Sequence, residues 1–338
     1  MINKAKVFVT RAIHPEAISK LKEFAEPEIW PLETPPPHAT LIEASSKVDA
    51  LLCMLTDPID QAVIDAGSTH LKVISQMAVG VDNIDVQYAT AQQIPVGHTP
   101  NVLTESCADF TWSLMTAIAR RVPESNREVM QGIWRPWGPD VLLGADLFQS
   151  TLGIIGLGRI GLAVAKRAIG FQMKVLYYSQ SRKPELESKY GFEYAALESL
   201  LQCSDFVSIH TSLNASTENL INATTLKFMK PSAFLINIAR GKIVHSQALT
   251  EAILNQKIAG AALDVFEPEP IPADHPLVKC KNVLLTPHIA SASAPIRKKM
   301  ALMCVENIRA ALINETIPYC YNPQVYNHLP HAAPQEVE

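Results

Sequence analysis

Three glycines near the middle of the chain constrain its fold more than any other feature. The run Thr151–Gly156 has the apolar composition of a buried strand, and Gly158 and Gly161 complete a G-x-G-x-x-G pattern before a helix-forming stretch begins. In this context Gly156 suits a tight turn, Gly158 lets the backbone approach a pyrophosphate, and Gly161 lets the helix press against the strand. The helix N-terminus then offers free N–H groups to the phosphates. The pattern therefore predicts a dinucleotide site, against the alternative of an ordinary glycine turn.

The residues after the next predicted strand indicate which dinucleotide binds. An NAD site usually carries an acidic residue near the end of that strand, where it accepts hydrogen bonds from the ribose hydroxyls. Between residues 157 and 184 this chain has no acidic residue, and Arg182 and Lys183 follow the strand instead. Basic side chains attract a 2′-phosphate, and the hydroxyls of Ser179 and Ser181 can donate to it. NADPH is therefore the expected cofactor, with NADH still possible. The alternative is a solvated surface loop whose basic residues have no ligand.

Short aliphatic runs alternate with longer helical patterns along the chain, which is typical of parallel α/β folds. A chain of 338 residues exceeds what one compact core usually holds, so two domains are expected. A long helical pattern over Asn101–Arg121 separates two series of strands, and a final helical pattern covers Pro295–Ile313. The predicted strands are Lys6–Thr10, Ala50–Leu55, Val73–Met77, Pro95–Thr99, Thr151–Gly156, Lys174–Ser179, Asp205–His210, Ala233–Ile238, Gly260–Val265 and Asn282–Thr286.

The composition argues against several classes of partner. The net charge is −4 with no long run of like charge, whereas nucleic acid or an anionic membrane surface requires a concentrated basic patch. No apolar run approaches the roughly 18 residues of a membrane span. The N-terminal residues show no secretory cleavage pattern. Six cysteines form no C-x-x-C pair, which fits free thiols in a reducing compartment. A cytoplasmic protein without a metal site is expected.

Polar residues at the ends of three predicted strands match the needs of hydride transfer to a keto acid. That reaction requires a proton donor, a cation that holds the substrate, and a partner that keeps the donor charged. His288 and Arg240 each follow a strand end, and the carboxylates Asp264 and Glu269 lie at a third. Side chains just beyond the carboxyl ends of parallel strands line the ligand crevice of an open sheet. Taken singly, each residue suits an ordinary ion pair, but their coincidence on successive strands favours a catalytic site. His210 also ends a strand, without a charged neighbour, and is interpreted as cofactor-lining or structural.

Together these segments resemble the D-2-hydroxyacid dehydrogenase family over roughly residues 7–319, and within it the glyoxylate/hydroxypyruvate reductases. The resemblance rests on the glycine loop and three further ordered motifs. These are Asn237-Ile-Ala-Arg-Gly241, Ala262-Leu-Asp-Val-Phe-Glu-Pro-Glu-Pro270 and Thr286-Pro-His288. Supporting segments are Val79-Gly-Val-Asp-Asn83, Asn101-Val-Leu-Thr-Glu105 and Trp134-Arg-Pro-Trp137.

The resemblance implies a role for each strand-end residue. Arg240 would bind the substrate carboxylate and the keto oxygen. His288 would donate the proton as hydride arrives from the nicotinamide, with Glu269 as its partner. Asp264 would contact the nicotinamide amide.

The resemblance also implies how the substrate and the rest of the cofactor are held. Backbone amides at Val79 and Gly80 would bind the substrate carboxylate, and Leu55 would line the substrate site. Trp137 would reach the substrate site of a partner subunit, which implies a homodimer; the alternative is an interface or core aromatic. The remaining residues expected at the cofactor are Thr104, Arg159, Ile160, His210, Ile238, Ala239 and Ser291.

The implied domain division is discontinuous. Residues 1–100 and 288–338 would form the substrate-binding domain, and residues 101–287 the NAD(P)-binding Rossmann domain. Both would be Rossmann-like or flavodoxin-like with parallel sheets, and the active site would lie in the interdomain cleft. His288 would then sit at the hinge, where closure excludes water. The tail after Tyr321 is expected to be poorly ordered.

The expected activity is an NADPH-preferring reduction of glyoxylate to glycolate or of hydroxypyruvate to D-glycerate. Glu269 stands where formate dehydrogenases have a glutamine, and Val79 stands where phosphite dehydrogenases usually have a lysine, so both activities rank low. No regulatory domain follows the last helix, which counts against the phosphoglycerate branch. A 2-ketogluconate reductase or another family member stays open. An alternative of a different class is a non-catalytic NAD(P)-sensing protein, like the corepressors that reuse this fold.

Overall fold

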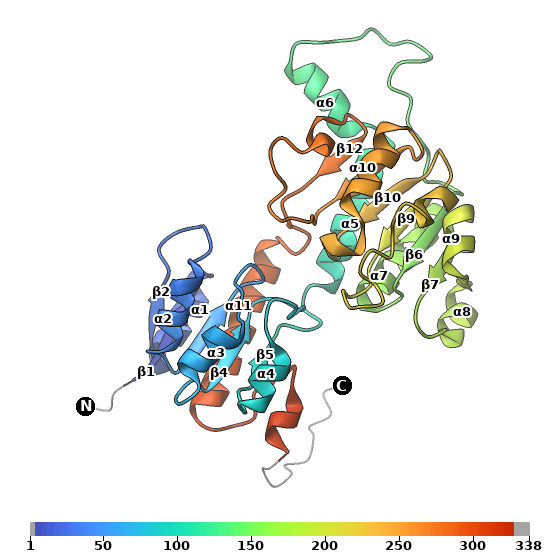
Figure 1. Cartoon of the computed structure of the whole chain (residues 1–338). Coiled ribbons are helices and arrows are strands. Elements are labelled where there is room, and N and C mark those ends of the chain that lie inside the picture. The colour runs from blue at the N-terminus through green and yellow to red at the C-terminus, as the bar shows by residue number, and fades with distance from the viewer. Residues whose placement is uncertain (1–3, 328–338) are drawn as a thin grey trace. The chain divides into compact units, whose positions relative to one another are not determined.

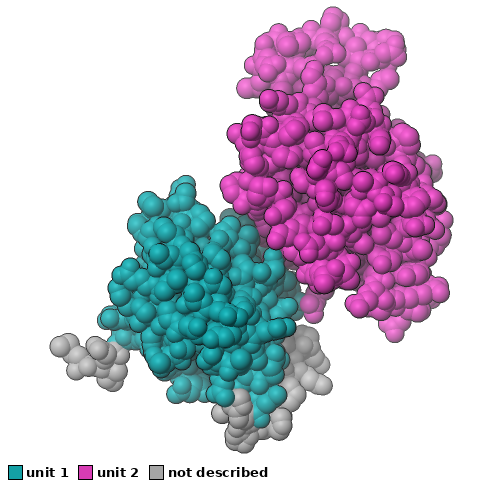
Figure 2. Space-filling model, viewed as in Figure 1, with its two compact units in different colours: residues 1–102, 293–338 teal, residues 103–292 magenta. Residues whose placement is uncertain are grey.

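A computed structural model describes residues 4–327 of the 338-residue chain (Figure 1). The chain forms two compact units, which Figure 2 colours separately: unit 1 comprises Met1–Val102 and Ser293–Glu338, and unit 2 comprises Leu103–Ala292. Each unit contains its own parallel sheet, so the predicted fold class of two parallel α/β domains is confirmed. Among residues 4–327, every helix is too short or too polar to span a membrane.

Unit 1 is built on a five-stranded parallel sheet in the order β2-β1-β3-β4-β5. This is the flavodoxin-like order, in which the winding reverses between β1 and β3. Every residue of β3 and β4 is buried, as expected for strands covered by helices on both faces. The strands are β1 (Ala5–Val9), β2 (Ala25–Ile29), β3 (Ala50–Cys53), β4 (Val73–Gln76) and β5 (Val96–Gly97). The helices are α1 (Pro15–Phe24), α2 (His38–Ser45), α3 (Gln61–Gly67), α4 (Val86–Ala91) and α11 (Ala294–Leu312).

The edge strand β2 is absent from the sequence-based prediction. Its sequence, Ala-Glu-Pro-Glu-Ile, contains two charges and Pro27, which conceal its strand character. Pro27 is tolerated because β2 lies at the edge of the sheet, where one side of the strand needs no ladder hydrogen bonds.

The C-terminal part of the chain returns to unit 1. Helix α11 packs against α1 and β4, and Lys298 forms an ion pair with Glu16 at 2.5 Å. The expectation of disorder after Tyr321 is wrong for the described residues, because Pro323–Tyr326 forms the 3₁₀ turn η5. Fully buried Asn322 fixes this turn by accepting a 2.7 Å hydrogen bond from the N–H of Val96 in β5. The rest of the tail lies outside the described residues.

Unit 2 is built on a seven-stranded parallel sheet in the order β12-β11-β10-β9-β6-β7-β8. The first six strands in sequence follow the dinucleotide-binding order 3-2-1-4-5-6, with the winding reversed between β6 and β9. The strands are β6 (Thr151–Ile155), β7 (Lys174–Tyr178), β8 (Glu193–Tyr194), β9 (Phe206–Ile209), β10 (Phe234–Asn237), β11 (Gly260–Leu263) and β12 (Val283–Leu285). The α-helices are α5 (Thr104–Ala119), α6 (Val122–Met130), α7 (Arg159–Ala168), α8 (Pro184–Tyr190), α9 (Leu197–Cys203) and α10 (Ser246–Leu254). Four 3₁₀ turns complete the unit: η1 (Ile169–Phe171), η2 (Thr225–Phe228), η3 (Gly241–Ile243) and η4 (Pro276–Lys279).

A long arm leaves the sheet of unit 2 between α5 and β6. It consists of α6 and residues 131–148, which extend away from the strands (Figure 1). Near its C-terminal end the arm is hydrogen-bonded to α5, where the N–H of Ala145 donates to the carbonyl of Ala119 at 2.9 Å.

Candidate functional site

The glycine loop after β6 has three different local geometries. Gly156 adopts φ +97°, in the left-handed region, and a Cβ there would lie 2.6 Å from the backbone nitrogen of Thr211. A Cβ on Gly161 would approach the Gly156 carbonyl oxygen more closely than the 3.0 Å that real Cβ atoms keep. A Cβ on Gly158 would meet no atom within 4 Å. The turn and the helix contact therefore require two of the glycines, whereas the space over Gly158 is open.

The surroundings of Gly158 fit a dinucleotide phosphate. Gly158 is the N-cap of helix α7, and no side chain caps the helix, so its first N–H groups, including those of Arg159 and Ile160, are left for a ligand. His210 follows β9, the strand that adjoins β6 at the reversal of winding. Its Nε2 lies 2.8 Å from Ser208 Oγ, and its buried Nδ1 has no hydrogen-bond partner among the described residues. Burial lowers the pKa of His210 to about 3, so the ring is neutral at physiological pH. A neutral ring with one nitrogen to spare is consistent with the expected cofactor-lining position.

The basic loop after β7 pairs with an acidic residue of the following helix. Arg182 donates from Nε and Nη2 to Glu187 in α8, at distances of 2.7 to 3.1 Å. Glu187 also accepts a 2.6 Å hydrogen bond from the Tyr177 hydroxyl, which in turn accepts one from the Lys183 N–H at 2.6 Å. Hydrogen bonds from Arg182 and then Tyr177 lower the pKa of Glu187 to about 2.

The loop is therefore not an unpaired basic segment. The acid that pairs with Arg182 lies just beyond the segment 157–184, so the absence of acids within it did not exclude an ion pair. The Ser179 hydroxyl donates to the carbonyl of Ser181 at 2.6 Å, so it already has an acceptor inside the loop. Arg182 keeps its full positive charge and a side chain that is 64% exposed, which leaves it able to meet an anion.

A histidine–carboxylate pair lies at the ends of β11 and β12. His288 Nδ1 is 2.7 Å from Glu269 Oε1, and the two side chains are only 20% and 29% exposed. Because an ionised carboxylate can only accept, Nδ1 carries a proton and Nε2 is the nitrogen that faces away from Glu269. The pairing expected from the sequence is thus present as a contact.

Asp264 holds the backbone that carries His288. His288 adopts φ +55°, a left-handed conformation that is uncommon for residues other than glycine. Its N–H donates to the Asp264 carbonyl at 2.9 Å, which places His288 in unit 2 rather than in the C-terminal segment predicted to start there. The fully buried Asp264 carboxylate accepts from the N–H groups of Ile289 and Ala290 at 2.9 and 2.8 Å. It also accepts from the Thr286 hydroxyl at 2.7 Å. This bracing role was not foreseen, because it depends on contacts between two strand ends.

Arg240 lies on the loop between β10 and η3. The side-chain amide of Asn237 donates to the Arg240 carbonyl at 2.9 Å, and Arg240 Nη1 donates to the Ala239 carbonyl at 2.7 Å. A Cβ on Gly241 would overlap the backbone of Phe266, so the loops after β10 and β11 touch. Arg240, Glu269 and His288 therefore follow three adjacent strands, as predicted.

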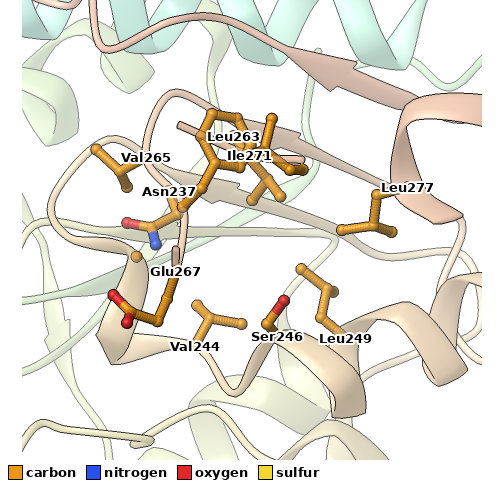
Figure 3. A pocket seen from close by; sticks show the side chains of 11 residues that line it. Asn237, Val244, Ser246, Leu249, Leu263, Val265, Glu267, Ile271 and Leu277 are labelled. Atoms are coloured by element: carbon orange, nitrogen blue, oxygen red, sulfur yellow. The ribbon is translucent and has the colours of Figure 1, made fainter. Parts of the chain in front are cut away.

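A small cavity is lined in part by residues of the loops after β10 and β11 (Figure 3). Its volume is about 20 Å³, and its polar lining includes Asn237, Ser246 and Glu267. That volume accommodates about one water molecule and no keto acid. The cavity is a packing feature next to the Arg240 loop rather than the substrate site.

The substrate residues expected in the N-terminal region lie in unit 1. Val79 and Gly80 form a partly exposed loop after β4, and Leu55 follows β3 at the reversal of winding. Trp137 lies on the arm of unit 2 and is 91% exposed, so in the isolated chain it is not a core aromatic.

The remaining cofactor candidates all lie in unit 2. Ile238 and Ala239 follow β10, and Ser291 follows the His288 turn. Thr104 is the first residue of α5. No contact of these residues identifies a role in cofactor binding.

Comparison with known proteins places this geometry in a family. Residues 112–290 match the NAD-binding domain of the D-isomer specific 2-hydroxyacid dehydrogenases. A glyoxylate reductase of Korarchaeum cryptofilum is 48% identical over 323 residues, which cover 95% of this chain and 97% of the relative. A glyoxylate reductase of Aeropyrum pernix is 45% identical over 328 residues, covering 96% and 98%.

Solved structures show the same likeness. A protein of Thermus thermophilus matches with a TM-score of 0.88 and 42% identity, covering 94% of this chain and 99% of the other. An NADPH-dependent glyoxylate/hydroxypyruvate reductase of Sinorhizobium meliloti, in complex with NADP and malonate, matches with a TM-score of 0.83 and 30% identity. That alignment covers 95% of this chain and 98% of the other.

Proposed function

The chain belongs to the D-isomer specific 2-hydroxyacid dehydrogenase family, and we propose that within it the chain is a reductase of glyoxylate or hydroxypyruvate. It is an NAD(P)-dependent oxidoreductase acting on CH–OH groups, as its family membership implies. The observation that carries the proposal is the 2.7 Å contact between His288 and Glu269, next to the loop of Arg240. Relatives at 43% to 48% identity are named glyoxylate reductases, which supports the choice of substrate.

Different residues of unit 2 would transfer the proton, polarise the keto oxygen and bind the cofactor phosphates. The bound nicotinamide would supply the hydride. Glu269 fixes the ring of His288 through Nδ1, so that Nε2 is the nitrogen from which a proton would pass to the keto oxygen. Arg240 would polarise the keto oxygen and hold the carboxylate, because its planar fork of N–H groups suits both. The phosphates would lie over Gly158 at the N-terminus of α7.

We further propose that NADPH is preferred over NADH. The support is the charged and exposed Arg182, held by Glu187, with Lys183 beside it. A guanidinium that is already oriented loses less rotamer entropy when it binds a phosphate. The Sinorhizobium meliloti relative, described as NADPH-dependent and bound to NADP, supports the same preference.

We propose that unit 1 binds the substrate carboxylate, through the N–H groups of Val79 and Gly80. Neither N–H donates a hydrogen bond within the described residues, and both belong to a partly exposed loop that a ligand can reach. Paired free donors of this kind are what a carboxylate requires.

We also propose a homodimer formed through the arm of unit 2. Several large apolar side chains of the arm are exposed, among them Met130 at 80%, Trp134 at 78% and Trp137 at 91%. Several large exposed apolar side chains on one segment of a chain indicate an interaction surface. Trp137 would then serve the partner subunit's substrate site. A cytoplasmic location is proposed on the free state of all six cysteines, which fits a reducing compartment.

The decisive experiment follows absorbance of the reduced cofactor at fixed enzyme concentration. NADPH and NADH are compared in parallel against glyoxylate, hydroxypyruvate, pyruvate and 2-ketogluconate. Fast NADPH oxidation with glyoxylate or hydroxypyruvate supports the proposal. Activity confined to 2-ketogluconate would make that acid the substrate in place of glyoxylate and hydroxypyruvate. Tight NADPH binding without turnover on all four acids would favour a sensor protein instead.

A further inference from the structure

The loop expected to hold the substrate carboxylate is fixed by hydrogen bonds to its carbonyl groups. The peptide groups that carry the N–H of Val79 and of Gly80 also carry the carbonyls of Ala78 and Val79. The Ala78 carbonyl accepts a 2.9 Å hydrogen bond from the N–H of Thr99, and the Val79 carbonyl lies 3.0 Å from Nδ1 of His98. Both donors come from the segment that follows β5. Each of the two peptide groups is therefore hydrogen-bonded at its oxygen and unpaired at its nitrogen within the described part of the chain.

The chemistry of this contact determines the state of His98. A carbonyl oxygen can only accept, so Nδ1 of His98 must carry a proton. The C-terminal segment holds this residue in place. The N–H of His98 donates to the carbonyl of Tyr319 at 3.0 Å, and its ring meets the ring of Tyr321 edge-on at 5.2 Å. Gln76, the last residue of β4, donates from Nε2 to the Gly80 carbonyl at the longer distance of 3.4 Å.

We propose that His98 is a positioning residue for substrate binding, which orients and polarises the Val79–Gly80 peptide group so that the Gly80 N–H binds the substrate carboxylate. A hydrogen bond received at the carbonyl withdraws electron density from the amide and strengthens its N–H as a donor. The same bond fixes the plane of the peptide, so the N–H keeps its direction when no substrate is present. This inference rests on the proposed binding of a keto acid by unit 1.

Two variants of nearly identical shape test the hydrogen bond. His98→Asn places an N–H donor at the position of Nδ1, the same number of bonds from the backbone, whereas His98→Leu has the same branched shape and no donor. Both remove the ring contact with Tyr321, so any loss of packing is common to the two. In His98→Leu the KM for glyoxylate should rise about three- to tenfold, with kcat within about twofold and the Kd of NADPH unchanged. His98→Asn should stay within about twofold of the wild type in KM. Equal KM values in the two variants would overturn the proposal.

A second readout does not depend on turnover. The chain contains only two Val-Gly pairs, Val79-Gly80 and Val96-Gly97, so labelling valine with ¹³C at the carbonyl and glycine with ¹⁵N gives two amide signals. Val79→Ile removes the Gly80 signal and assigns it. The Gly80 amide proton should resonate at higher field in His98→Leu than in His98→Asn. Without a hydrogen bond from residue 98 to the Val79 carbonyl, the Gly80 N–H is less polarised.

The two readouts separate this inference from the proposed function. If the wild type reduces none of the keto acids while the Gly80 signal differs as expected, the proposed function fails and the effect of His98 on the Gly80 amide stands. If the wild type reduces glyoxylate but neither the Gly80 signal nor KM distinguishes the variants, the proposed function stands and the role of His98 is refuted.

Discussion

Gly158 and Gly161 allow the cofactor loop to be tested by two substitutions that add the same methyl group. A Cβ at Gly158 meets no atom within 4 Å, so Gly158→Ala should fold normally. Its two effects on stability oppose each other. Alanine stabilises the folded state by about 0.4–1 kcal/mol, because it lowers the conformational entropy of the unfolded chain. It destabilises the helix by a similar amount, because it is a poorer N-cap than glycine. A net change of less than about 1 kcal/mol is expected. The open space over Gly158 is where the pyrophosphate would lie, so a methyl group there should displace it.

The magnitude for binding follows from the hydrogen bonds that the methyl group would lengthen. A hydrogen bond to a charged phosphate contributes about 1.5–3 kcal/mol, so the loss of one raises the Kd of NADPH roughly 10- to 100-fold. Gly161→Ala differs, because its Cβ would overlap the Gly156 carbonyl, and a backbone atom cannot avoid the clash by changing rotamer. Overpacking of this kind typically costs about 1–3 kcal/mol, in addition to any loss of binding.

Binding is measured by quenching of protein fluorescence on titration with NADPH, and stability by urea unfolding of the cofactor-free protein. Gly158→Ala should lose affinity and keep its unfolding midpoint, whereas Gly161→Ala should lose both. If Gly158→Ala binds NADPH as tightly as the wild type, the phosphate does not lie over Gly158. If Gly161→Ala unfolds at the wild-type midpoint, the close contact of α7 with β6 is not needed for stability.

The catalytic acid, the loop after β7 and the exposed arm can each be tested by substitution. His288→Ala should lower kcat about 10²- to 10⁴-fold with little change in the Kd of NADPH, and near-normal turnover would exclude it as the acid. Arg182→Ala should weaken NADPH about tenfold or more while NADH binding is unchanged, and an equal effect on both would show a solvated loop. Glu187→Gln should give an intermediate Kd for NADPH, because Arg182 keeps its charge and loses its bidentate partner. Trp137→Ala should leave the denaturation midpoint unchanged and weaken dimerisation, as measured by sedimentation at decreasing concentration, and an unchanged dimer would exclude Trp137 from the interface.

The parts of the structure that were predictable from sequence are those with strong local signals. The glycine loop combines a buried strand with a fixed spacing, and both the left-handed φ of Gly156 and the contact of Gly161 with the Gly156 carbonyl arise within the motif itself. Strand β2 was missed because an edge position relaxes the composition rules on which strand prediction depends. The partner of Arg182 was missed for a different reason. Glu187 lies five positions after Arg182, in the first part of α8, and so beyond the segment 157–184 in which acidic residues were sought.

The two carboxylates beside His288 show the same limit within the site itself. By position in the chain alone, Asp264 and Glu269 are two acids at one strand end, and the structure separates their tasks by burial. Asp264 is fully buried and its carboxylate accepts three hydrogen bonds, all from the turn that carries His288. A left-handed non-glycine residue costs of order 1–3 kcal/mol, and these buried bonds are what can offset it. Glu269 is 29% exposed and contacts the ring instead. Asp264 thus fixes where the histidine lies and Glu269 fixes how its ring is turned, so any contact of Asp264 with the nicotinamide must use the little acceptor capacity that the turn leaves free.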